Sequence, residues 1–378
     1  MKRWTFFATC APGVEPILHA ECRSLGLAKT ERQVGGVRFE GTMGDVRRAN
    51  LVLRTAVRIL RREARFEAAS ESALDEGVAA VDWSRFLGAG GTLWVDAQSK
   101  ESALDHTQFI KQRVKDVVVD QLRAPDGTRP SVDRESADVR LHLHLFRDRA
   151  TLSVDTSGAS LHLRGWRSAQ GRAPLAETLA AAVVLSGGWD RRSPVVDPFC
   201  GTGTLLVEAA MVAWGVPPGA TRARFGFEGW SDHDARAWLA EREAAVAAIR
   251  PSKKLRLVGS DVAPERIEEA RAHIANHPHL APLAESARFE VADARDFEHR
   301  AGWNAFVVSN MPYGERVGED VEALHMGFGA RVSAHAGDRV ALLTGSSRLA
   351  GLLRIRGHER TKLLNGGIEC ELVTAEIV

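Results

Sequence analysis

The residues best suited to chemistry are the tetrapeptide Asn310-Met311-Pro312-Tyr313, which directly follows the apolar run AFVVS. A short apolar run that ends in polar residues predicts a buried strand. In open α/β sheets, ligands bind beyond the carboxyl ends of such strands. An amide, a carbonyl held by proline and an aromatic ring at that place are suited to chemistry at an amino group on a planar base.

Two hydrogen-bond acceptors here would activate an exocyclic amine, whose lone pair is otherwise delocalised into the ring. The side-chain oxygen of Asn310 is one acceptor. The carbonyl of Met311 is the other, because Pro312 restricts the backbone before it. The ring of Tyr313 would stack on a flipped base, a contact of roughly 1–3 kcal/mol. The alternative is an ordinary Asn-x-Pro turn after a strand, and the four residues are predicted to be catalytic.

A glycine loop predicts a second ligand site on the same sheet. The segment PVVDPFCGTGTLLVEAA reads as a strand, a Gly-x-Gly turn and a helix. Glycines allow a close approach of the backbone, and the helix N-terminus offers free N–H groups to a phosphate or a carboxylate. Gly-x-Gly alone fits NAD, nucleotides and S-adenosylmethionine. The candidate residues are Asp197, Pro198, Phe199, Cys200, Gly201, Thr202, Gly203 and Thr204.

Three features favour S-adenosylmethionine as the cofactor. The third glycine of a dinucleotide fingerprint would fall at Leu206, which is bulky, and the next acidic strand end, Asp261, lies far beyond the ~20 residues expected for NAD. A further strand ends at Asp293. Three strand ends thus present acceptors for an ammonium, a ribose diol and an adenine amino group, with Val262 and Ala294 beside them. The alternative is that these aspartates only cap the following helices.

Other chemistries have less support. Methylation of a pyrimidine carbon needs a cysteine nucleophile near the 305–309 strand, and none lies there. Cys200 reads as a small packing residue. The four cysteines form no CxxC pair, so free thiols and no metal site are predicted. His142 and His144 share a strand face and are interpreted as surface residues.

From about Gly165 onward the chain alternates strands and helices. Such alternation is typical of an open, mostly parallel, doubly wound sheet. A helix is expected over 175–185, and the turn Asn365-Gly366 predicts a final hairpin that adds an antiparallel strand at the sheet edge. The expected core strands are Val195–Asp197, Arg256–Ser260, Arg288–Ala292, Ala305–Ser309 and Arg339–Thr344.

The N-terminal part predicts smaller α+β units. Strands are expected at 3–9 and 37–39, a helix over 16–26 and a long helix over 45–65, an order with a ferredoxin-like look. A strand at 92–97, a helix over 106–123 and a hairpin of 139–146 with 150–155 follow.

Basic residues on these expected helices are candidates for RNA phosphates. The spacing of the arginines over 45–65 would place several of them on one face of a helix. Lysines of the later helix add charge. For any single residue, the alternative is that its side chain is only exposed to solvent. Arg113, Arg164, Arg167 and Arg172 add further charge. The predicted RNA-binding residues are Arg47, Arg54, Arg58, Arg61, Lys111, Lys115 and Arg316, with Arg65 on the same expected face.

Bulk properties leave the nature of the partner open. The chain has 378 residues and a formal net charge of +1, so only a local basic face would bind nucleic acid. No segment approaches the ~20 apolar residues that span a bilayer. A cytoplasmic protein is expected, with structured RNA as partner, no membrane and no obligate protein partner.

With these motifs together, the chain resembles the THUMP-containing class I RNA methyltransferases, and among them the guanine-N2 methyltransferases of bacterial large-subunit rRNA. The resemblance covers nearly the whole chain. One departure is Met311, where the family often has proline; Pro312 still constrains the carbonyl. The bacterial enzyme is sometimes fused to a second methyltransferase, and no such second domain is expected here. The motifs that carry the resemblance are FFATCAPGVEPIL, NLVLRTAVRIL, DTSGASLHLRGWR, APLAETLAAA, DPFCGTGTLLVEAA and SNMPYGERVG.

The resemblance implies a ferredoxin-like segment (1–65), a THUMP RNA-binding domain (66–160) and a Rossmann-like S-adenosylmethionine-dependent methyltransferase domain (161–378). It implies that the glycine loop holds the methionine part, with Pro174 and Glu177 flanking it, that Asp261 takes the ribose, Asp293 the adenine, and 310–313 the base. Residues 314–316 after Tyr313 favour guanine over adenine N6. tRNA in place of rRNA, and a non-catalytic RNA-binding assembly factor, remain alternatives.

Overall fold

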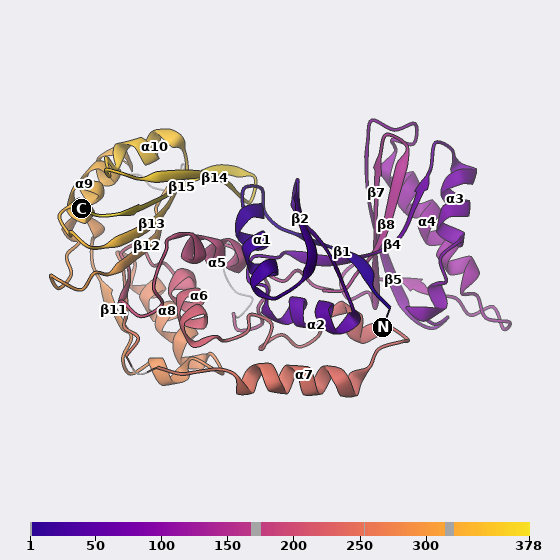
Figure 1. Cartoon of the computed structure of the whole chain (residues 1–378), viewed down its shortest axis with the longest axis horizontal. Coiled ribbons are helices and arrows are strands. Elements are labelled where there is room, and N and C mark those ends of the chain that lie inside the picture. The colour runs from indigo at the N-terminus through magenta and orange to yellow at the C-terminus, as the bar shows by residue number, and fades with distance from the viewer. Residues whose placement is uncertain (1, 168–174, 253, 314–320) are drawn as a thin grey trace.

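The computed structural model describes residues 2–167, 175–252, 254–313 and 321–378. The molecule is elongated, with a lobe at each end and a smaller unit between them (Figure 1). An eight-stranded sheet runs through the middle unit and one lobe, and a seven-stranded sheet forms the centre of the other lobe. The α/β fold class predicted from the sequence, with α+β units before an open sheet, is confirmed.

The middle unit has the predicted ferredoxin-like character. A capping box between Thr42 and Asp45 starts its second helix, and Pro16 lies in the first turn of the first helix, where proline is well tolerated. Its elements are β1 (Trp4–Thr9), α1 (Glu15–Ser24), β2 (Ala28–Gln33), β3 (Gly36–Gly41), α2 (Met43–Val52) and β4 (Arg58–Glu67).

The long helix predicted over 45–65 is wrong. Helix α2 ends at Val52, and Leu53 has extended backbone angles. Residues 58–67 form β4 instead, because Ile59 and Arg61 alternate with less buried neighbours at the period of a strand. The arginines that seemed to repeat along one helix therefore belong to a helix, a loop and a strand.

Strand β4 is shared by the middle unit and the end lobe. It pairs with β1 on one edge and with β8 (Arg149–Asp155) on the other. The sheet order is β2-β3-β1-β4-β8-β7-β5-β6. A bulge between Arg62 and Ala64 shifts the register of β4 against β8. Such a bulge also bends the strand that carries it.

The outer lobe packs two helices on one face of its strands. Leu141, Leu143 and Leu145 alternate with exposed or half-buried residues, as expected for a sheet covered on one side. Its remaining elements are α3 (Glu71–Ala79), η1 (Trp83–Arg85), β5 (Thr92–Lys100), α4 (Thr107–Gln121), β6 (Ser131–Val132) and β7 (Val139–Phe146).

The other lobe contains the predicted doubly wound sheet, in the order β11-β10-β9-β12-β13-β15-β14. The first five of these strands pair in parallel, and β15 joins β13 antiparallel, as the final hairpin predicted. The strand order reverses between β9 and β12, where such sheets bind ligands. The strands are β9 (Val195–Asp197), β10 (Leu257–Asp261), β11 (Arg288–Val291), β12 (Phe306–Asn310), β13 (Arg339–Thr344), β14 (Glu359–Asn365) and β15 (Ile368–Glu376).

Helices cover both faces of this sheet. Helix α6 is buried along almost its whole length, which explains its nearly uninterrupted apolar sequence. None of the helices in the described part of the chain is long and apolar enough to cross a membrane. The helices are α5 (Glu177–Ser186), α6 (Thr204–Trp214), η2 (Gly226–Gly229), α7 (Ala235–Ala247), α8 (Pro264–Asn276), η3 (Ala281–Leu283), η4 (Ala294–Asp296), α9 (Val321–Ser333) and α10 (Ser347–Leu352).

Candidate active site

The carboxyl ends of β9 and β12 lie side by side, which brings the two predicted sites together. The strands pair in parallel through Val195 and Val196. The hydroxyl of Ser309, just before Asn310, donates a hydrogen bond of 2.6 Å to Oδ1 of Asp197. The residues at 197–204 and 310–313 therefore border the same edge of the sheet.

Asp197 is a buried acid with an unused acceptor. Its exposed fraction is 1%, and its Oδ2 atom has no hydrogen-bond partner among the described residues. Burial raises the pKa of this carboxyl to about 7, and the charge of Asp261 raises it further. The hydrogen bonds from Ser309 and from the backbone N–H of Phe199 lower the pKa, but burial outweighs them. A cation placed beside Asp197 would restore the ionised form.

The glycine loop has the left-handed backbone that its composition predicts. Gly201 and Gly203 have φ values of +51° and +79°. A Cβ atom on Gly203 would lie 3.1 Å from Cβ of Ala270, so a side chain there would also crowd α8. Gly203 caps α6 without any side-chain hydrogen bond to the helix N-terminus. The first N–H groups of α6 thus remain available to an anion.

Asp261 holds this loop in place. Its two carboxylate oxygens accept hydrogen bonds from the backbone N–H of Gly201 at 2.9 Å and of Ala263 at 3.0 Å. A ring nitrogen of His273 lies 2.8 Å from the carbonyl oxygen of Thr202. No pattern around His273 predicted this contact. Each carboxylate oxygen of Asp261 keeps a second lone pair for a ligand hydroxyl.

Asp293 lies at the next strand end and is paired with Arg295. The carboxylate accepts from the guanidinium of Arg295, with a shortest distance of 2.6 Å, and from its backbone N–H. These bonds lower the pKa of Asp293. Ala294 is buried, whereas Val262 is 65% exposed and offers an apolar surface beside Asp261.

Asn310 ends β12 with a buried acceptor. Its Oδ1 atom is shielded from solvent and has no hydrogen-bond partner in the described chain. The next residue is fixed, because the side chain of Met311 is fully buried and its backbone N–H donates to the carbonyl of Leu343 at 3.0 Å. Pro312 in turn restricts the backbone of Met311, the residue before it.

Tyr313 is held by the C-terminal hairpin. The side-chain amide of Asn365, the last residue of β14, donates to the Tyr313 hydroxyl at 2.7 Å. A Cβ atom at Gly345 would clash with Cβ and Cγ of Tyr313, so only glycine lets the ring lie there. The sequence showed Asn365 only as a hairpin turn; its contact with the site depends on the antiparallel edge of the sheet.

Arg167 connects Glu177 to the start of α6. The side chain of Glu177 is buried, and its carboxylate lies 3.2 Å from Nε of Arg167. The same guanidinium donates to the hydroxyl of Thr204 at 2.5 Å. The start of α5 and the start of α6 are thereby connected. Pro174 and Arg316, the remaining predicted site residues, lie outside the described residues, as does Arg172.

Two of the arginines predicted to bind RNA are occupied by carboxylates. Arg47 forms a bidentate pair with Glu241 of α7, at 2.6 and 2.8 Å. Arg58 binds the buried Asp155 at 2.5 Å. Both contacts bring together segments that are far apart in sequence.

Of the other two arginines, Arg61 is buried and Arg54 is half-buried. Arg54 donates to the carbonyls of Met211 and Val216 at the end of α6. Arg61 is paired with Glu63 and packs against aromatic rings, with its guanidinium carbon 4.5 Å from the ring centre of Trp230. These contacts assign both residues to the internal structure, and the common helix face predicted for all four does not exist.

The predicted lysines of α4 are also paired. Lys111 lies 3.8 Å from a carboxylate oxygen of Asp96, and Lys115 pairs with Asp116. The charge of each is therefore partly neutralised by a neighbour.

A cluster of His299, His335 and Asp338 was missed by the sequence reading. It lies at the amino ends of β12 and β13, opposite the site. His299 lies 2.6 Å from Asp338, and its ring stacks on His335 with ring centres 4.1 Å apart. Burial alone would lower the pKa of His299, but the bond to Asp338 outweighs it and raises the pKa. Potential ligand atoms lie within 4.8 Å of one another, yet stacked rings do not aim their in-plane lone pairs at one point.

Known proteins match both the parts and the whole of this chain. The family model described as RMKL-like methyltransferase domain matches residues 164–374, the model for the RlmL ferredoxin-like domain matches 5–60, and the THUMP domain model matches 68–155. The protein of Syntrophotalea carbinolica named Ribosomal RNA large subunit methyltransferase K/L is 40% identical over 98% of this chain and 53% of its own length. The chain spans about half the length of the curated relatives it matches.

Solved structures agree over the entire chain. The crystal structure of SMU.472 in complex with SAH is 29% identical and has a TM-score of 0.88, covering 100% of this chain and 98% of that one. A Listeria monocytogenes protein, described as a predicted N6-adenine-specific DNA methylase, is 30% identical with a TM-score of 0.86, covering 99% and 96%. The chain therefore belongs to the RMKL-like methyltransferase family, with a ferredoxin-like unit and a THUMP domain before its methyltransferase domain.

Proposed function

We propose that this protein transfers a methyl group from S-adenosylmethionine to N2 of a guanine in large-subunit ribosomal RNA. The curated relatives named as large-subunit rRNA methyltransferases support the RNA class. The SAH bound in the SMU.472 structure supports the cofactor. The chain's own residues support chemistry at an exocyclic amine.

The observation that carries the proposal is the unpartnered Oδ1 of Asn310. A buried acceptor left without a donor costs about 1–3 kcal/mol, so its place at the carboxyl end of β12 needs a reason. An amino group of a base that enters the site would supply the missing N–H donor. The carbonyl of Met311, held by its buried side chain and by Pro312, would accept the second N–H.

The residues present fit S-adenosylmethionine. Its ammonium would meet the free Oδ2 of Asp197, and its carboxylate would meet the uncapped N-terminus of α6. The ribose hydroxyls would donate to the remaining lone pairs of Asp261, and the exposed side chain of Val262 would pack against the adenine, whose amino group would turn toward Asp293. When bound, the cofactor supplies an electrophilic methyl group.

The protein's role in transfer is positioning. With both N–H groups of the amine held by acceptors, the nitrogen lone pair points away from them and toward the methyl group. In the transfer, the base nitrogen would bond to the methyl carbon as the bond between that carbon and sulfur breaks, and the proton that the nitrogen then loses would pass to water. The ring of Tyr313, fixed by Asn365 and by the absence of a side chain at Gly345, would stack on the base.

Three other assignments compete with this one. The same acceptors would serve N6 of adenine, and the description of the Listeria protein favours that base. tRNA is the competing RNA substrate. A non-catalytic assembly factor would not need the free acceptors at Asp197 and Asn310.

The test of substrate class is transfer of labelled methyl groups from S-adenosylmethionine. Unmodified large-subunit rRNA, unmodified tRNA and adenine-containing DNA would be offered in parallel, with cofactor binding measured by calorimetry. We expect label in rRNA. Label in tRNA or DNA alone would contradict the rRNA assignment, and bound cofactor with no transfer to any of the three would favour the assembly factor.

A further inference from the structure

In the outer lobe, helices cover only one face of the shared sheet. The other face carries arginines that have no carboxylate partner in the described chain. Helices α3 and α4 lie on the outer side of β4, β5, β7 and β8, so the opposite face is turned toward the lobe that holds β14 and β15 (Figure 1). The residues of β7 and β8 that point to the helices are buried, including Leu143 and Leu152. We call the opposite face, formed by the alternating residues of these strands, the open face.

The bulge in β4 places two arginines on this open face. Residues 62 and 65 are three apart, so in a regular strand their side chains would point to opposite faces. The register shift between Arg62 and Ala64 changes that: Arg62 lies opposite Ser153 and Arg65 opposite Thr151 on β8. Ser153 and Thr151 are two apart and share a face. Their neighbours on β7 are His142 and His144.

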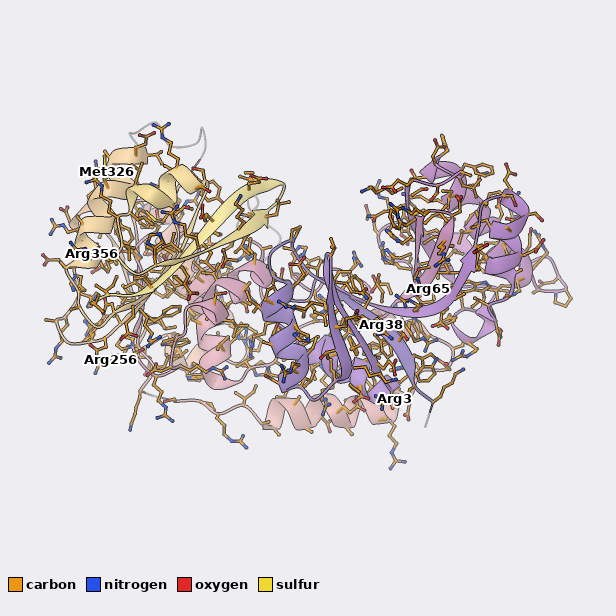
Figure 2. All side chains as sticks on the ribbon, turned by 45° about the horizontal axis from the view of Figure 1, so that its top comes forward. Arg3, Arg38, Arg65, Arg256, Met326 and Arg356 are labelled. Atoms are coloured by element: carbon orange, nitrogen blue, oxygen red, sulfur yellow. The ribbon has the colours of Figure 1, made fainter. Side chains whose placement is uncertain are left out.

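Neither arginine is neutralised. Within the described chain, Arg62 and Arg65 form no ion pair or hydrogen bond with a carboxylate, unlike Arg47, Arg58 and Arg61. Figure 2 shows Arg65 where the outer lobe joins the middle unit, with Arg38 near it. Burial, together with the charges of Arg65 and Arg38, lowers the pKa of Arg62. Arg38 itself is paired with Glu31 and Glu40, so the charge without a carboxylate partner in the described chain is that of Arg62 and Arg65.

The acids of the open face do not cancel this charge. Asp155 is buried and bound by Arg58, with His142 also near it. Asp96 is contacted by Lys111. Glu67 lies at the far end of β4, opposite another basic residue, Arg149.

We propose that the open face around Arg62 and Arg65 binds the phosphate backbone of the RNA substrate. The inference rests on the proposed function and deepens it, because it names the surface that receives the RNA. Guanidinium groups on a half-buried strand are held more rigidly than those on a loop and bind phosphate oxygens through paired N–H donors. The exposed His144, across Thr151 of β8 from Arg65, adds a ring and a donor to the same face.

The open face also lies on the correct side of the molecule. It is turned toward the lobe whose β14 ends at Asn365, the residue that holds Tyr313. An RNA whose backbone lies against β4 and β8 can therefore extend toward the site without passing around α3 and α4. The lysines of α4 are not needed for this path, because Lys111 pairs with Asp96 and Lys115 pairs with Asp116 of its own helix.

The test uses the full chain and an unmodified large-subunit rRNA transcript, with affinity measured by filter binding over a range of potassium chloride concentrations. The double variant Arg62→Ser/Arg65→Ser removes two phosphate contacts. We expect affinity at about 0.1 M salt to fall roughly tenfold or more, and the slope of log affinity against log salt to become shallower by about 1.4–1.8. Affinity for S-adenosylmethionine should stay unchanged.

Two further variants keep the result interpretable. Arg62→Lys/Arg65→Lys retains the charges and should keep most of the salt slope. The matched control Arg129→Ser/Arg236→Ser removes two exposed arginines outside the open face, and neither pairs with a carboxylate in the described chain. It should bind like the wild type. The circular dichroism spectrum and melting temperature of each variant check that it folds.

The outcomes separate this inference from the proposed function. If the wild type binds and methylates the transcript while Arg62→Ser/Arg65→Ser binds with the same affinity and slope, the inference is overturned and the proposed function stands. An equal loss in the Arg129→Ser/Arg236→Ser control would also overturn it, because charge anywhere would then suffice. If the wild type binds cofactor but neither binds nor methylates the transcript, the proposed function fails, and the inference with it.

Discussion

Asn310 has a buried acceptor atom without a donor, which indicates a ligand at this residue. Buried polar atoms in folded proteins nearly always have partners, and the exceptions need an explanation. Asn310 Oδ1 and Asp197 Oδ2 are two such exceptions at adjacent strand ends. A base amine and an ammonium are the two groups that would satisfy them. The free Oδ1 of Asn310 therefore supports binding of the base, and the free Oδ2 of Asp197 supports binding of the cofactor.

Replacement of Asn310 tests the amine-acceptor role. Asn310→Ala should lower kcat by roughly 10²–10³-fold, the loss typical when one preorganised hydrogen-bonding group is removed from a site. The dissociation constant for S-adenosylmethionine should not change. Single-turnover methyl transfer and calorimetry measure the two quantities. Asn276→Ala, at an exposed helix end, is the control. Turnover like that of the wild type in Asn310→Ala would remove Asn310 from the mechanism.

The pKa of Asp197 predicts how cofactor binding depends on pH. The carboxyl titrates at about 7 in the free protein, and an ammonium prefers the ionised form. Affinity should therefore rise by up to about tenfold per pH unit as pH approaches 7 from below, with proton release on binding. Above about 8 the cofactor's own amine loses its proton and affinity should fall.

Asp197→Asn should abolish the acid limb of this profile and leave the alkaline limb. Calorimetry from pH 5.5 to 8.5, in buffers of different ionisation enthalpy, measures both affinity and proton release. An unchanged acid limb in Asp197→Asn would assign the titration to another group.

Single residues near the glycine loop were predictable because their chemistry is local. Gly201, Gly203 and the strand-end aspartates follow from the strand–turn–helix pattern. The residues that hold the loop in place were not predictable from the sequence. His273 and Ser309 reach the loop from other elements, and nothing in their own sequence neighbourhoods marks those contacts.

At the scale of elements, β4 shows where sequence periodicity fails. Arginines at 47, 54, 58, 61 and 65 have spacings close to those of helix neighbours, and that pattern predicted a helix over 45–65. The chain instead ends α2 at Val52 and pairs residues 58–67 in the middle of a sheet. Tertiary pairing with β1 and β8 outweighed local helix propensity.

The turn between β13 and α10 gives a prediction at the same scale. Gly345→Ala would place a Cβ atom inside the van der Waals radius of Tyr313. Tyr313 must then move, so kcat/KM for RNA should fall while the affinity for S-adenosylmethionine is kept, and overpacking should cost about 1–3 kcal/mol of stability. Gly351→Ala in α10, whose Cβ would have only the flexible end of Arg360 within 4 Å, is the control. Equal activity of both variants would mean that the position of Tyr313 does not matter.

At the scale of the whole molecule, buried charges connect the N-terminal units to the methyltransferase domain. Arg164 is 2% exposed; it lies 3.1 Å from Glu208 of α6 and donates to the carbonyl of Arg54 at 2.6 Å. Arg222 donates to four carbonyls between Ser157 and Leu163. The units that would receive RNA are thus attached directly to the helix that starts at the glycine loop.

Loss of one partner tests this connection. Glu208→Ala leaves the buried guanidinium of Arg164 unpaired and should lower the free energy of unfolding by about 3–5 kcal/mol. Glu268→Ala, which breaks the exposed pair with Arg271, should cost at most about 1 kcal/mol. Urea denaturation followed by tryptophan fluorescence measures both. A similar small loss in the two variants would show that the buried pair does not stabilise the junction.

The fold class was predictable because strand–helix alternation and the final hairpin are encoded locally. The arrangement of the domains was not, because it depends on one strand shared by two units and on arginines that bind carbonyls far away in sequence. Two of these arginines, Arg54 and Arg164, were expected to contact RNA, since composition alone does not show which charges are bound inside the protein.

The measurement that tests the central claim most directly is the identity of the methylated nucleoside. Large-subunit rRNA labelled by the wild-type protein would be digested completely and analysed by mass spectrometry against synthetic standards. The account predicts label in N2-methylguanosine, and its loss in Asn310→Ala. Label in N6-methyladenosine, in a ring carbon or in a ribose would contradict transfer to guanine N2.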